Sequence, residues 1–253
     1  VGINHFLAHI YSCLMDEPGS CMDPAAFPLL ALVVSGGHTH LVVIGKDGAA
    51  RIVGQTVDDA AGEAFDKAAR ILDLGYPGGP EIERLARKGD PGAHRFPRGL
   101  TGGSGRPVAP ENRYNFSFSG LKTALLYRVQ GETLSEEQLC SIAASYQAAI
   151  VDVLVSKTLD AAKAFQAHTV LLCGGVACNN VLRKEMADKA AEMKVPLWQA
   201  PKTYCTDNAA MIAGCAYHYL KSENVSDPAV CVQARLNRDL GHVPFVPHPC
   251  RTL

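Results

Sequence analysis

Residues 27–48 read FPLLALVVSGGHTHLVVIGKDG, and this stretch decides the class of fold. Two apolar runs rich in β-branched residues, at about 29–34 and 39–45, flank the segment SGGH at 35–38. Runs of this length and composition favour buried strands, and the glycines between them favour a tight turn. The stretch therefore predicts a β-hairpin with a Ser-Gly-Gly tip, followed by a third strand at about 50–55.

Strand, glycine turn and helix recur along the rest of the chain. In LLCGGVACNN at 171–180, a buried strand at 169–173 meets a Gly-Gly turn and a helix that begins near residue 178. A helical pattern also follows Asp58 and Asp59, whose carboxylates favour a helix start by capping and by the helix dipole. This alternation predicts an α/β fold. The other expected elements are helices at about 80–89, at 135–166 as one bent helix or two, and after Thr206-Asp207-Asn208, a strand at 194–200, and an extended loop at 90–115.

Composition narrows the class of protein. With 253 residues, of which 47% are hydrophobic, the chain can bury a substantial core. Lys plus Arg number 24 against 25 acidic residues, so the net charge carries no signature of nucleic-acid or membrane binding. No apolar stretch reaches the roughly 18–20 residues of a membrane span. The nine cysteines form no C-x-x-C pair and lie mostly in apolar runs, which indicates reduced thiols in a cytosol-like compartment.

One segment is locally basic. From Arg84 to Arg113 there are seven Lys or Arg residues, and Asp90 and Glu111 are the acidic residues among them. A solvated loop and a contact surface for an anionic partner explain this composition equally well.

Two histidines stand four residues apart in NHFLAH at 4–9. On a helix this spacing brings His5 and His9 to one face, with Cβ atoms about 5–6 Å apart, which suits two ligands of one metal ion. An ordinary polar stripe beside apolar neighbours is the alternative, and a third ligand has to come from elsewhere. The zinc-protease helix needs a glutamate directly after its first histidine, and Phe6 occupies that place. A metalloprotease is therefore disfavoured.

The two glycine turns, at 35–37 and 174–176, match neither the Walker motif nor the dinucleotide fingerprint. Each alone is consistent with a plain tight turn. Glycines after a buried strand also let backbone N–H groups approach a phosphate or a nucleobase closely. A hairpin with a Ser-Gly-Gly tip and a later Gly-Gly-Val at a strand-to-helix junction together have the layout of the nucleotide folds of sugar kinases, heat-shock proteins and actin.

Six motifs make the resemblance to one family specific. NHFLAH, VVSGGHTHLV, DDAAGEAFDKAARILDLGYPGGPEIERLA, FSFSGLKTAL, CGGVACNNVLR and CTDNAAMIA occur in this order, and the match spans residues 1 to about 240. The chain resembles the universal tRNA threonylcarbamoyltransferase family, called TsaD in bacteria and formerly described as O-sialoglycoprotein endopeptidase. DDAAGEAFDK resembles its bacterial and mitochondrial branch. The resemblance implies a two-lobed nucleotide-binding fold of the actin, heat-shock and sugar-kinase (ASKHA) type.

The resemblance also implies an activity. Members transfer a threonylcarbamoyl group from threonylcarbamoyl-adenylate to N6 of the adenosine beside the anticodon, in tRNAs that read codons beginning with A. Their usual partners are tRNA, a TsaB-like paralogue and a TsaE-like ATPase, and a homodimer is compatible with the family. No membrane partner is expected. The implied location is the cytoplasm, with the mitochondrial matrix as an alternative.

The implied site follows motif by motif. His5, His9 and Asp207 match the family's metal ligands, and two imidazoles with one carboxylate suit Fe²⁺ or Zn²⁺ with open positions for substrate oxygens. The residues that match the substrate site are Val33, Val34, Ser35, Gly36 and Gly37 in the hairpin, Asp66 and Gly79 near the nucleotide's sugar, and Asn179 at the adenosine turn. Glu83, four residues after Gly79, is a further candidate for a ribose contact.

The beginning of the chain departs from the family pattern, in which about a hundred residues with a first phosphate loop precede the histidine pair. We therefore expect an incomplete N-terminal lobe. The expected segments are a remnant of that lobe at 1–60, an insertion with the basic loop at 61–134 and a C-terminal lobe at 135–253. The chain by itself is expected to lack transfer activity, and a non-catalytic scaffold of the same fold is the alternative function.

Overall fold

The fold is built on one mixed β-sheet. The computed structural model describes residues 2–15, 23–102, 107–221 and 239–243. Its sheet has the strand order β5-β4-β1-β2-β3-β6. The strands are β1 (Leu29–Val34), β2 (Thr39–Ile44), β3 (Ala49–Gln55), β4 (Thr169–Cys173), β5 (Leu197–Gln199) and β6 (Asp239–His242). β1, β4 and β5 run parallel, whereas β2, β3 and β6 pair antiparallel with their neighbours.

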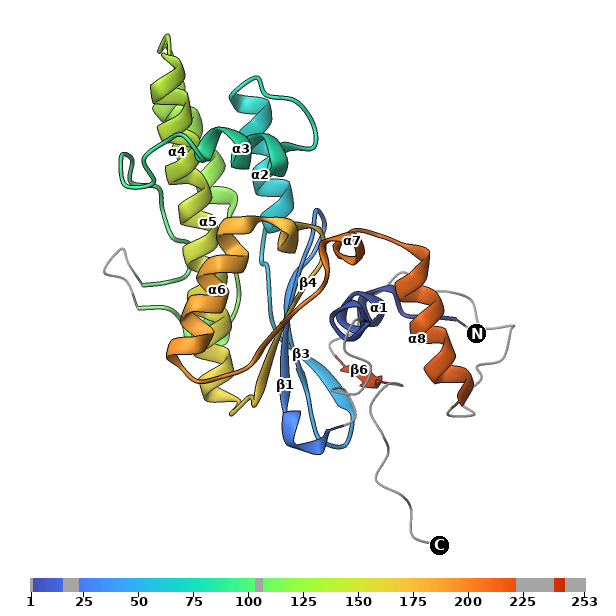
Figure 1. The fold of residues 1–253 in the computed structure, drawn as a ribbon. Coiled ribbons are helices and arrows are strands. Elements are labelled where there is room, and N and C mark those ends of the chain that lie inside the picture. The colour runs from blue at the N-terminus through green and yellow to red at the C-terminus, as the bar shows by residue number, and fades with distance from the viewer. Residues whose placement is uncertain (1, 16–22, 103–106, 222–238, 244–253) are drawn as a thin grey trace, which may run out of the picture.

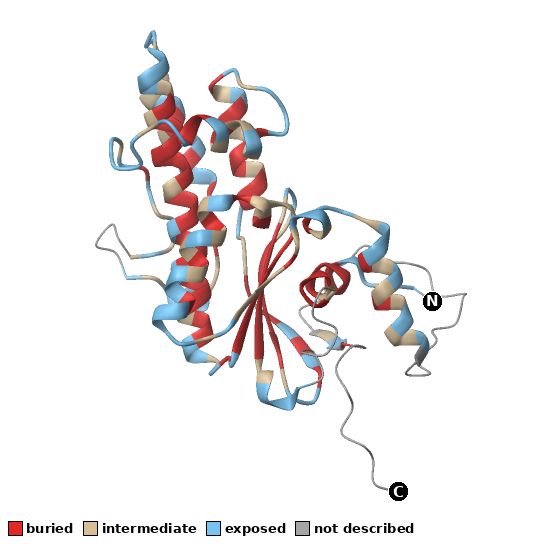
Figure 2. Cartoon of the chain, in the orientation of Figure 1, coloured by how far each residue is buried: buried red, intermediate tan, exposed pale blue. Residues whose placement is uncertain are grey.

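The predicted hairpin is confirmed. β1 and β2 pair antiparallel from Leu29 opposite Ile44 to Val34 opposite Thr39, and the segment 35–38 connects them. Every residue of β1, β2 and β4 is buried, because helices cover both faces of the sheet at these strands. Figure 2 shows these strands as buried, and apart from Thr39, His40 and Thr169 at their starts they read in sequence as apolar runs without alternation.

Helices form a layer on each side of the sheet. They are α1 (His5–Tyr11), α2 (Ala61–Ile71), α3 (Gly78–Ala86), α4 (Ser119–Val129), α5 (Glu136–Ala164), α6 (Asn180–Glu192), α7 (Lys202–Cys205) and α8 (Ala209–Lys221). In Figure 1, α1 and α8 lie on one side of the sheet and α5 and α6 on the other. α3 packs on α2 and on the far end of α5, beyond the edge where β1 and β4 end. The expected α/β fold is confirmed.

α5 is one continuous helix of 29 residues and not two. Ser135 and Gln138 form a capping box at its start, with each side chain bonded to the other's backbone N–H. By length and composition α5 is apolar enough to span a membrane, which contradicts the expectation that no segment is long enough. However, 72% of its most apolar 18-residue stretch is buried inside the molecule. In this fold it is a core helix.

The predicted capping of α2 by Asp58 and Asp59 is wrong. The N-cap residue of α2 is Ala60, which has no capping side chain, and the Ala61 N–H donates instead to Thr39 Oγ1 of β2 at 2.9 Å. Asp58 turns to α4 and accepts hydrogen bonds from Ser117, Phe118 and Ser119. Thr39 of β2 therefore caps α2. The Asp58 carboxylate caps α4, a helix that the sequence pattern did not predict.

Three further elements differ from expectation. α7 and α4 were not predicted, and β5 covers only three residues of the expected strand at 194–200. The division into segments 1–60, 61–134 and 135–253 stays a prediction. Strands of the first and third segments pair directly in this sheet, through β1 and β4.

Candidate functional site

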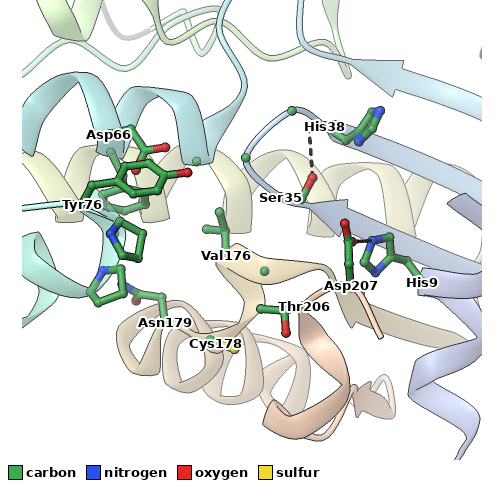
Figure 3. Close-up of a pocket in the computed structure, with 18 of the residues that line it drawn as sticks. His9, Ser35, His38, Asp66, Tyr76, Val176, Cys178, Asn179, Thr206 and Asp207 are labelled. Atoms are coloured by element: carbon green, nitrogen blue, oxygen red, sulfur yellow. Dashed lines mark hydrogen bonds and ion pairs between the residues drawn. The ribbon is translucent and has the colours of Figure 1, made fainter. Parts of the chain in front are cut away.

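A cleft of 740 Å³ opens beside the turn that joins β1 and β2. Its walls come from α1, that turn, the first turns of α2 and α3, the 3₁₀ turn Gly175–Cys178 after β4, and the segment before α8. Figure 3 shows Asp66 and Tyr76 on one side of it and His9 and Asp207 on the other. The predicted site residues that line it are His5, His9, Ser35, Gly36, Gly37, Asp66, Gly79, Glu83, Asn179 and Asp207.

Val33 and Val34 are the predicted site residues that do not line this cleft. Their side chains are 1% and 0% exposed in the centre of the sheet. Any contribution to a ligand would have to come from their backbone. Their positions match the family motif, but their side chains pack in the hydrophobic core.

The Ser-Gly-Gly turn is closed by its own hydrogen bonds. The Ser35 N–H donates to the His38 carbonyl at 2.8 Å, and the His38 N–H donates to Ser35 Oγ at 3.2 Å. A Cβ built on Gly36 or Gly37 would meet nothing within 4 Å, so the tip faces open space at the cleft. Backbone approach by a ligand is unobstructed there.

The N-terminus of α2 abuts this turn. The Gly62 N–H donates to the Ser35 carbonyl at 3.2 Å, and a Cβ on Gly62 would lie 2.6 Å from that oxygen. Only glycine permits this approach. Because the positive end of the helix dipole lies at the turn, this end of the cleft favours an anion.

Two carboxylates lie on the opposite wall. Asp66 Oδ1 accepts a hydrogen bond from the Gly78 N–H at 2.7 Å and so ties α2 to the start of α3. Glu83 Oε1 accepts from the backbone N–H and the side-chain amide of Asn180 and so ties α3 to the start of α6. Among the described residues no group donates to the second oxygen of either carboxylate, which leaves that oxygen for hydroxyl donors of a ligand.

Asn179 is 7% exposed and is held on both sides. Its Oδ1 accepts from the Leu182 N–H as the N-cap of α6, and its Nδ2 donates to Gln147 Oε1 of α5 at 2.7 Å. The side chain thus positions the 3₁₀ turn against α5 and α6, and this turn forms the floor of the cleft.

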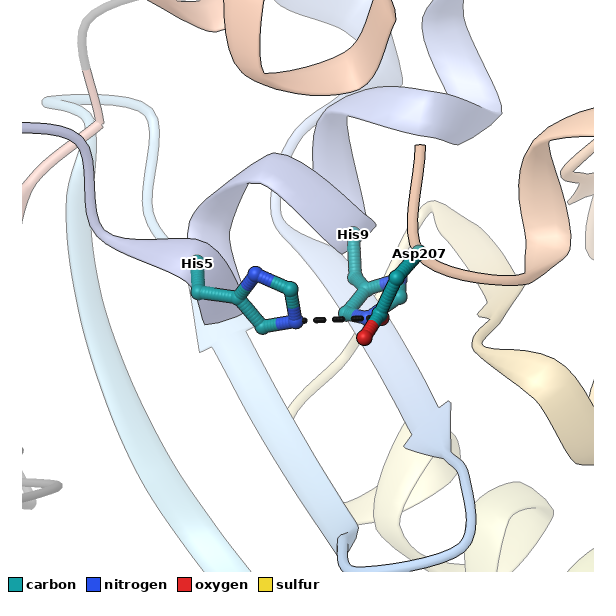
Figure 4. A group of neighbouring side chains, drawn as sticks. All are labelled: His5, His9 and Asp207. Carbon is teal, nitrogen blue, oxygen red and sulfur yellow. Dashed lines mark hydrogen bonds and ion pairs between the residues drawn. The ribbon is translucent and has the colours of Figure 1, made fainter. Parts of the chain in front are cut away.

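His5, His9 and Asp207 converge at the other end of the cleft (Figure 4). Asn4 caps α1, and the helical spacing places both histidines on one face. His5 Nε2 lies 3.2 Å and His9 Nε2 3.1 Å from Asp207 Oδ1, and the three potential ligand atoms lie within 4.8 Å of one another. Two imidazole nitrogens and a carboxylate around one point fit Zn²⁺ or Fe²⁺.

His9 and His38 favour the neutral state. Burial, and then the neighbouring His5, lower the pKa of His9, and Asp207 only partly opposes them. Burial and His5 also lower the pKa of His38, which lines the cleft. Neutral imidazoles have a free lone pair, which is the form that ligates a metal.

The sequence interpretation left several lining residues without a role, among them His38, Tyr76, Val176, Cys178 and Thr206. Tyr76 and His38 belong to the quoted GYPGGP and SGGHT motifs, so their position in a motif was the available signal. A hydrogen bond with Cys205 lowers the pKa of the Cys178 thiol to about 7, although burial opposes the shift. The residues around Cys178 in the sequence give no sign of this lowered pKa, because its cause, Cys205, lies 27 positions away.

The basic segment from Arg84 to Arg113 is mostly neutralised within the fold. Arg98 donates two hydrogen bonds to one oxygen of Asp152, and Arg113 forms a bidentate contact with Asp160. Arg84, Arg87 and Lys88 pair with Glu81, Glu83 and Glu136. Arg106 lies outside the described residues. The local excess of positive charge in the sequence is therefore largely balanced by acids from α3 and α5.

The architecture is that of an α/β protein whose mixed sheet is covered by helices on both faces. The solved structure of full-length HypF in its phosphate- and nucleotide-bound form superposes with a TM-score of 0.62 over 91% of this chain and 37% of that chain. At 12% identity this likeness concerns the fold alone.

The family follows from sequence comparison. A family model described as "TsaD: tRNA N6-adenosine threonylcarbamoyltransferase" matches residues 1–214, and the chain belongs to this family. Proteins of that name from Symbiobacterium thermophilum and Moorella thermoacetica are 48% and 47% identical over 86% and 88% of this chain. The matched regions span 60% and 62% of those two relatives. A relative from Syntrophotalea carbinolica is 42% identical over 99% of this chain and 69% of its own length.

Proposed function

We propose that this chain carries the nucleotide and metal site of a tRNA threonylcarbamoyltransferase. The reaction joins N6 of the adenosine beside the anticodon to the carbamoyl carbon of threonylcarbamoyl-adenylate, in tRNAs that read codons beginning with A. The new C–N bond replaces the bond to the phosphate oxygen, AMP leaves with that electron pair, and the amine loses a proton. The observation that carries the proposal is the single cleft that joins the metal triad, the Ser-Gly-Gly turn and two carboxylates.

Each end of the cleft has a distinct part in this proposal. Backbone N–H groups at Gly36 and Gly37, with the N-terminus of α2 behind them, would bind the phosphate of the adenylate. The free oxygens of Asp66 and Glu83 would accept hydrogen bonds from its ribose hydroxyls. The adenine would lie against the turn held by Asn179. A metal ion held by His5, His9 and Asp207 would supply electrostatic attraction for substrate oxygens.

The proposed partners follow from family membership. They are tRNA as acceptor, a TsaB-like paralogue and a TsaE-like ATPase, with a homodimer as a further assembly. The six cysteines described by the structure are free thiols, which supports a reducing compartment such as the cytoplasm or the mitochondrial matrix.

Calorimetry with AMP in the presence of Zn²⁺ tests the nucleotide site. We expect one AMP per chain, and Gly36→Val should weaken binding at least about tenfold, because a β-branched side chain blocks backbone approach. Gly120→Val is the matched control, since a Cβ on Gly120 also meets nothing within 4 Å and Gly120 lies on α4, outside the cleft. Equal losses in both variants would contradict the assignment.

Transfer is measured with the natural gene product that contains residues 1–253, together with both partner proteins, threonylcarbamoyl-adenylate and an unmodified tRNA. Mass spectrometry of the digested tRNA should show the threonylcarbamoyl nucleoside. A tRNA with guanosine at the target position should stay unmodified. Absence of the product with intact AMP binding would reject the transfer reaction and retain the nucleotide site.

A further inference from the structure

A second cavity, of 470 Å³, lies directly beside the cleft. It is formed by the exposed face of α2 and the segment 73–76 that leads to α3. Asp66 and Tyr76 line both cavities and so form a shared wall. A ligand that extends out of the cleft past Tyr76 enters this second cavity next.

Tyr76 is unusually exposed for an aromatic residue in a wall. Its side chain is 86% exposed, the highest value among the exposed large hydrophobic residues that the structure describes. Figure 3 shows it beside Asp66, across the cleft from His9 and Asp207. An accessible aromatic ring at the junction of two cavities offers a flat face on which a nucleobase can stack.

Two cations and three carboxylates line the second cavity. Lys67 is engaged by Asp59 at 2.6 Å and by Glu63 at 2.9 Å. Arg70 is exposed and has no ion pair within the described part of the chain, unlike most cations of the basic segment. Arg70 is therefore available for a backbone phosphate.

Away from Arg70, carboxylates make the lining unsuitable for a phosphate. Glu63, Asp66 and Asp73 line the cavity and would repel an anion, whereas carboxylates accept hydrogen bonds from the amino and ring N–H groups of nucleobases. An aromatic face, several acceptor groups and one available cation match a nucleotide whose base meets the ring and the carboxylates and whose phosphate meets Arg70.

We propose that the second cavity holds an unpaired base of the acceptor RNA, next to the target adenosine, stacked on Tyr76 with Arg70 at the backbone phosphate. The inference rests on the proposed function and deepens it, since it assigns the path by which the RNA strand reaches the cleft. Unpaired loop nucleotides can be splayed onto aromatic side chains in this way.

Fluorescence anisotropy with a labelled anticodon stem-loop RNA tests the proposal. Tyr76→Ala should weaken RNA binding about tenfold, whereas Tyr76→Phe, which keeps the ring, should stay within about twofold. Arg70→Gln should weaken binding and reduce the magnitude of the salt slope by about 0.7, the value for one phosphate of a single strand. Tyr127→Ala is the matched control, because Tyr127 is a 73% exposed tyrosine on α4, away from both cavities.

Abasic substitutions locate the stacked base. We expect one position flanking the target adenosine at which loss of the base weakens RNA binding to the wild-type protein. The same loss should not further weaken RNA binding to the Tyr76→Ala variant. Additive effects of the two changes at every flanking position would overturn the proposal. The same holds if Tyr76→Ala weakens AMP binding and leaves RNA binding intact, since the ring would then belong to the adenylate site.

Calorimetry with AMP on the same proteins distinguishes failure of the RNA site from failure of the proposed nucleotide site. Wild-type protein that binds AMP but not the stem-loop RNA would overturn the second cavity as an RNA site and leave the nucleotide cleft in place. Failure of AMP binding itself would reject the proposed function.

Discussion

Single residues around the cleft carry unusual protonation properties. His40 of β2 is 7% exposed, and its Nδ1 has no hydrogen-bond partner within the described residues. Burial, and then the nearby His38, lower its pKa from 6.5 to about 4. The folded protein therefore holds this imidazole neutral at a pH where the unfolded chain binds a proton.

This shift predicts a loss of stability in acid. Because the pKa of His40 is lower in the folded state, the unfolded state binds more protons between pH 6.5 and 4, and the free energy of unfolding falls as the pH falls through that window. One such proton contributes a slope of up to about 1.4 kcal/mol per pH unit. Urea unfolding of His40→Gln from pH 7 to 4 should show a slope reduced by this amount. A residual slope is expected from His9 and His38, whose pKa values are also lowered. An unchanged slope would mean that His40 is accessible to protons in the folded state.

At the scale of elements, helix ends are held by residues far away in sequence. Asp58 accepts from Ser117 Oγ at 2.6 Å, from the Phe118 N–H at 2.8 Å and from Ser119 Oγ at 2.7 Å, and so holds the start of α4 against the end of β3. Burial alone would raise the pKa of Asp58, but the hydrogen bonds from Ser117, Phe118 and Ser119 together lower it. The carboxylate thus serves as a cap provided by another part of the fold.

Asp58→Ala should lower the free energy of unfolding by about 1–2 kcal/mol, the cost of losing a helix cap. Asp58→Asn should recover part of this loss, because its amide oxygen still accepts from a backbone N–H. Asp59→Ala is the neighbouring control: it removes a largely buried ion pair with Lys67, which keeps Glu63 as its other partner, and should cost no more than about 1 kcal/mol. Chemical denaturation followed by circular dichroism measures all three. An equal cost for the two alanine variants would contradict the capping role.

At the scale of the molecule, the proposed metal site joins segments far apart in the chain. His5 and His9 come from α1, and Asp207 precedes α8, which packs against α1. A ligand bound across this contact stabilises the folded state, because the unfolded chain does not hold the three groups together. Metal binding should therefore raise the Tm of the protein.

Zn²⁺ at about a hundred times its dissociation constant should add about 2.7 kcal/mol to the free energy of unfolding and raise Tm by roughly 5–10 °C. Asp207→Ala should abolish this shift and leave the metal-free Tm nearly unchanged, because the Asp207 side chain is 79% exposed. His168→Ala is the control, since His168 is an exposed histidine outside the cleft. Differential scanning calorimetry with and without a chelator measures the shift. A shift that persists in Asp207→Ala would place the metal elsewhere.

Local signals in the sequence determined the β1–β2 hairpin, the α/β class and the helical pairing of His5 and His9. These features depend on apolar periodicity, glycine turns and spacing along one element, all of which are written in neighbouring residues. The long motifs likewise determined the family, because they preserve order and spacing along the chain.

Only the tertiary structure decided which residues meet. It brought Asp207 to His5 across 202 positions, gave α2 its cap from Thr39 and α4 its cap from Asp58, and placed Val33 and Val34 in the core of the sheet. It also paired the basic segment with acids of α3 and α5 and left Arg70 and Tyr76 accessible beside the cleft. Contacts of this kind depend on how separate elements pack, and the pattern of neighbouring residues does not encode them, because many arrangements of the same elements bury similar apolar faces.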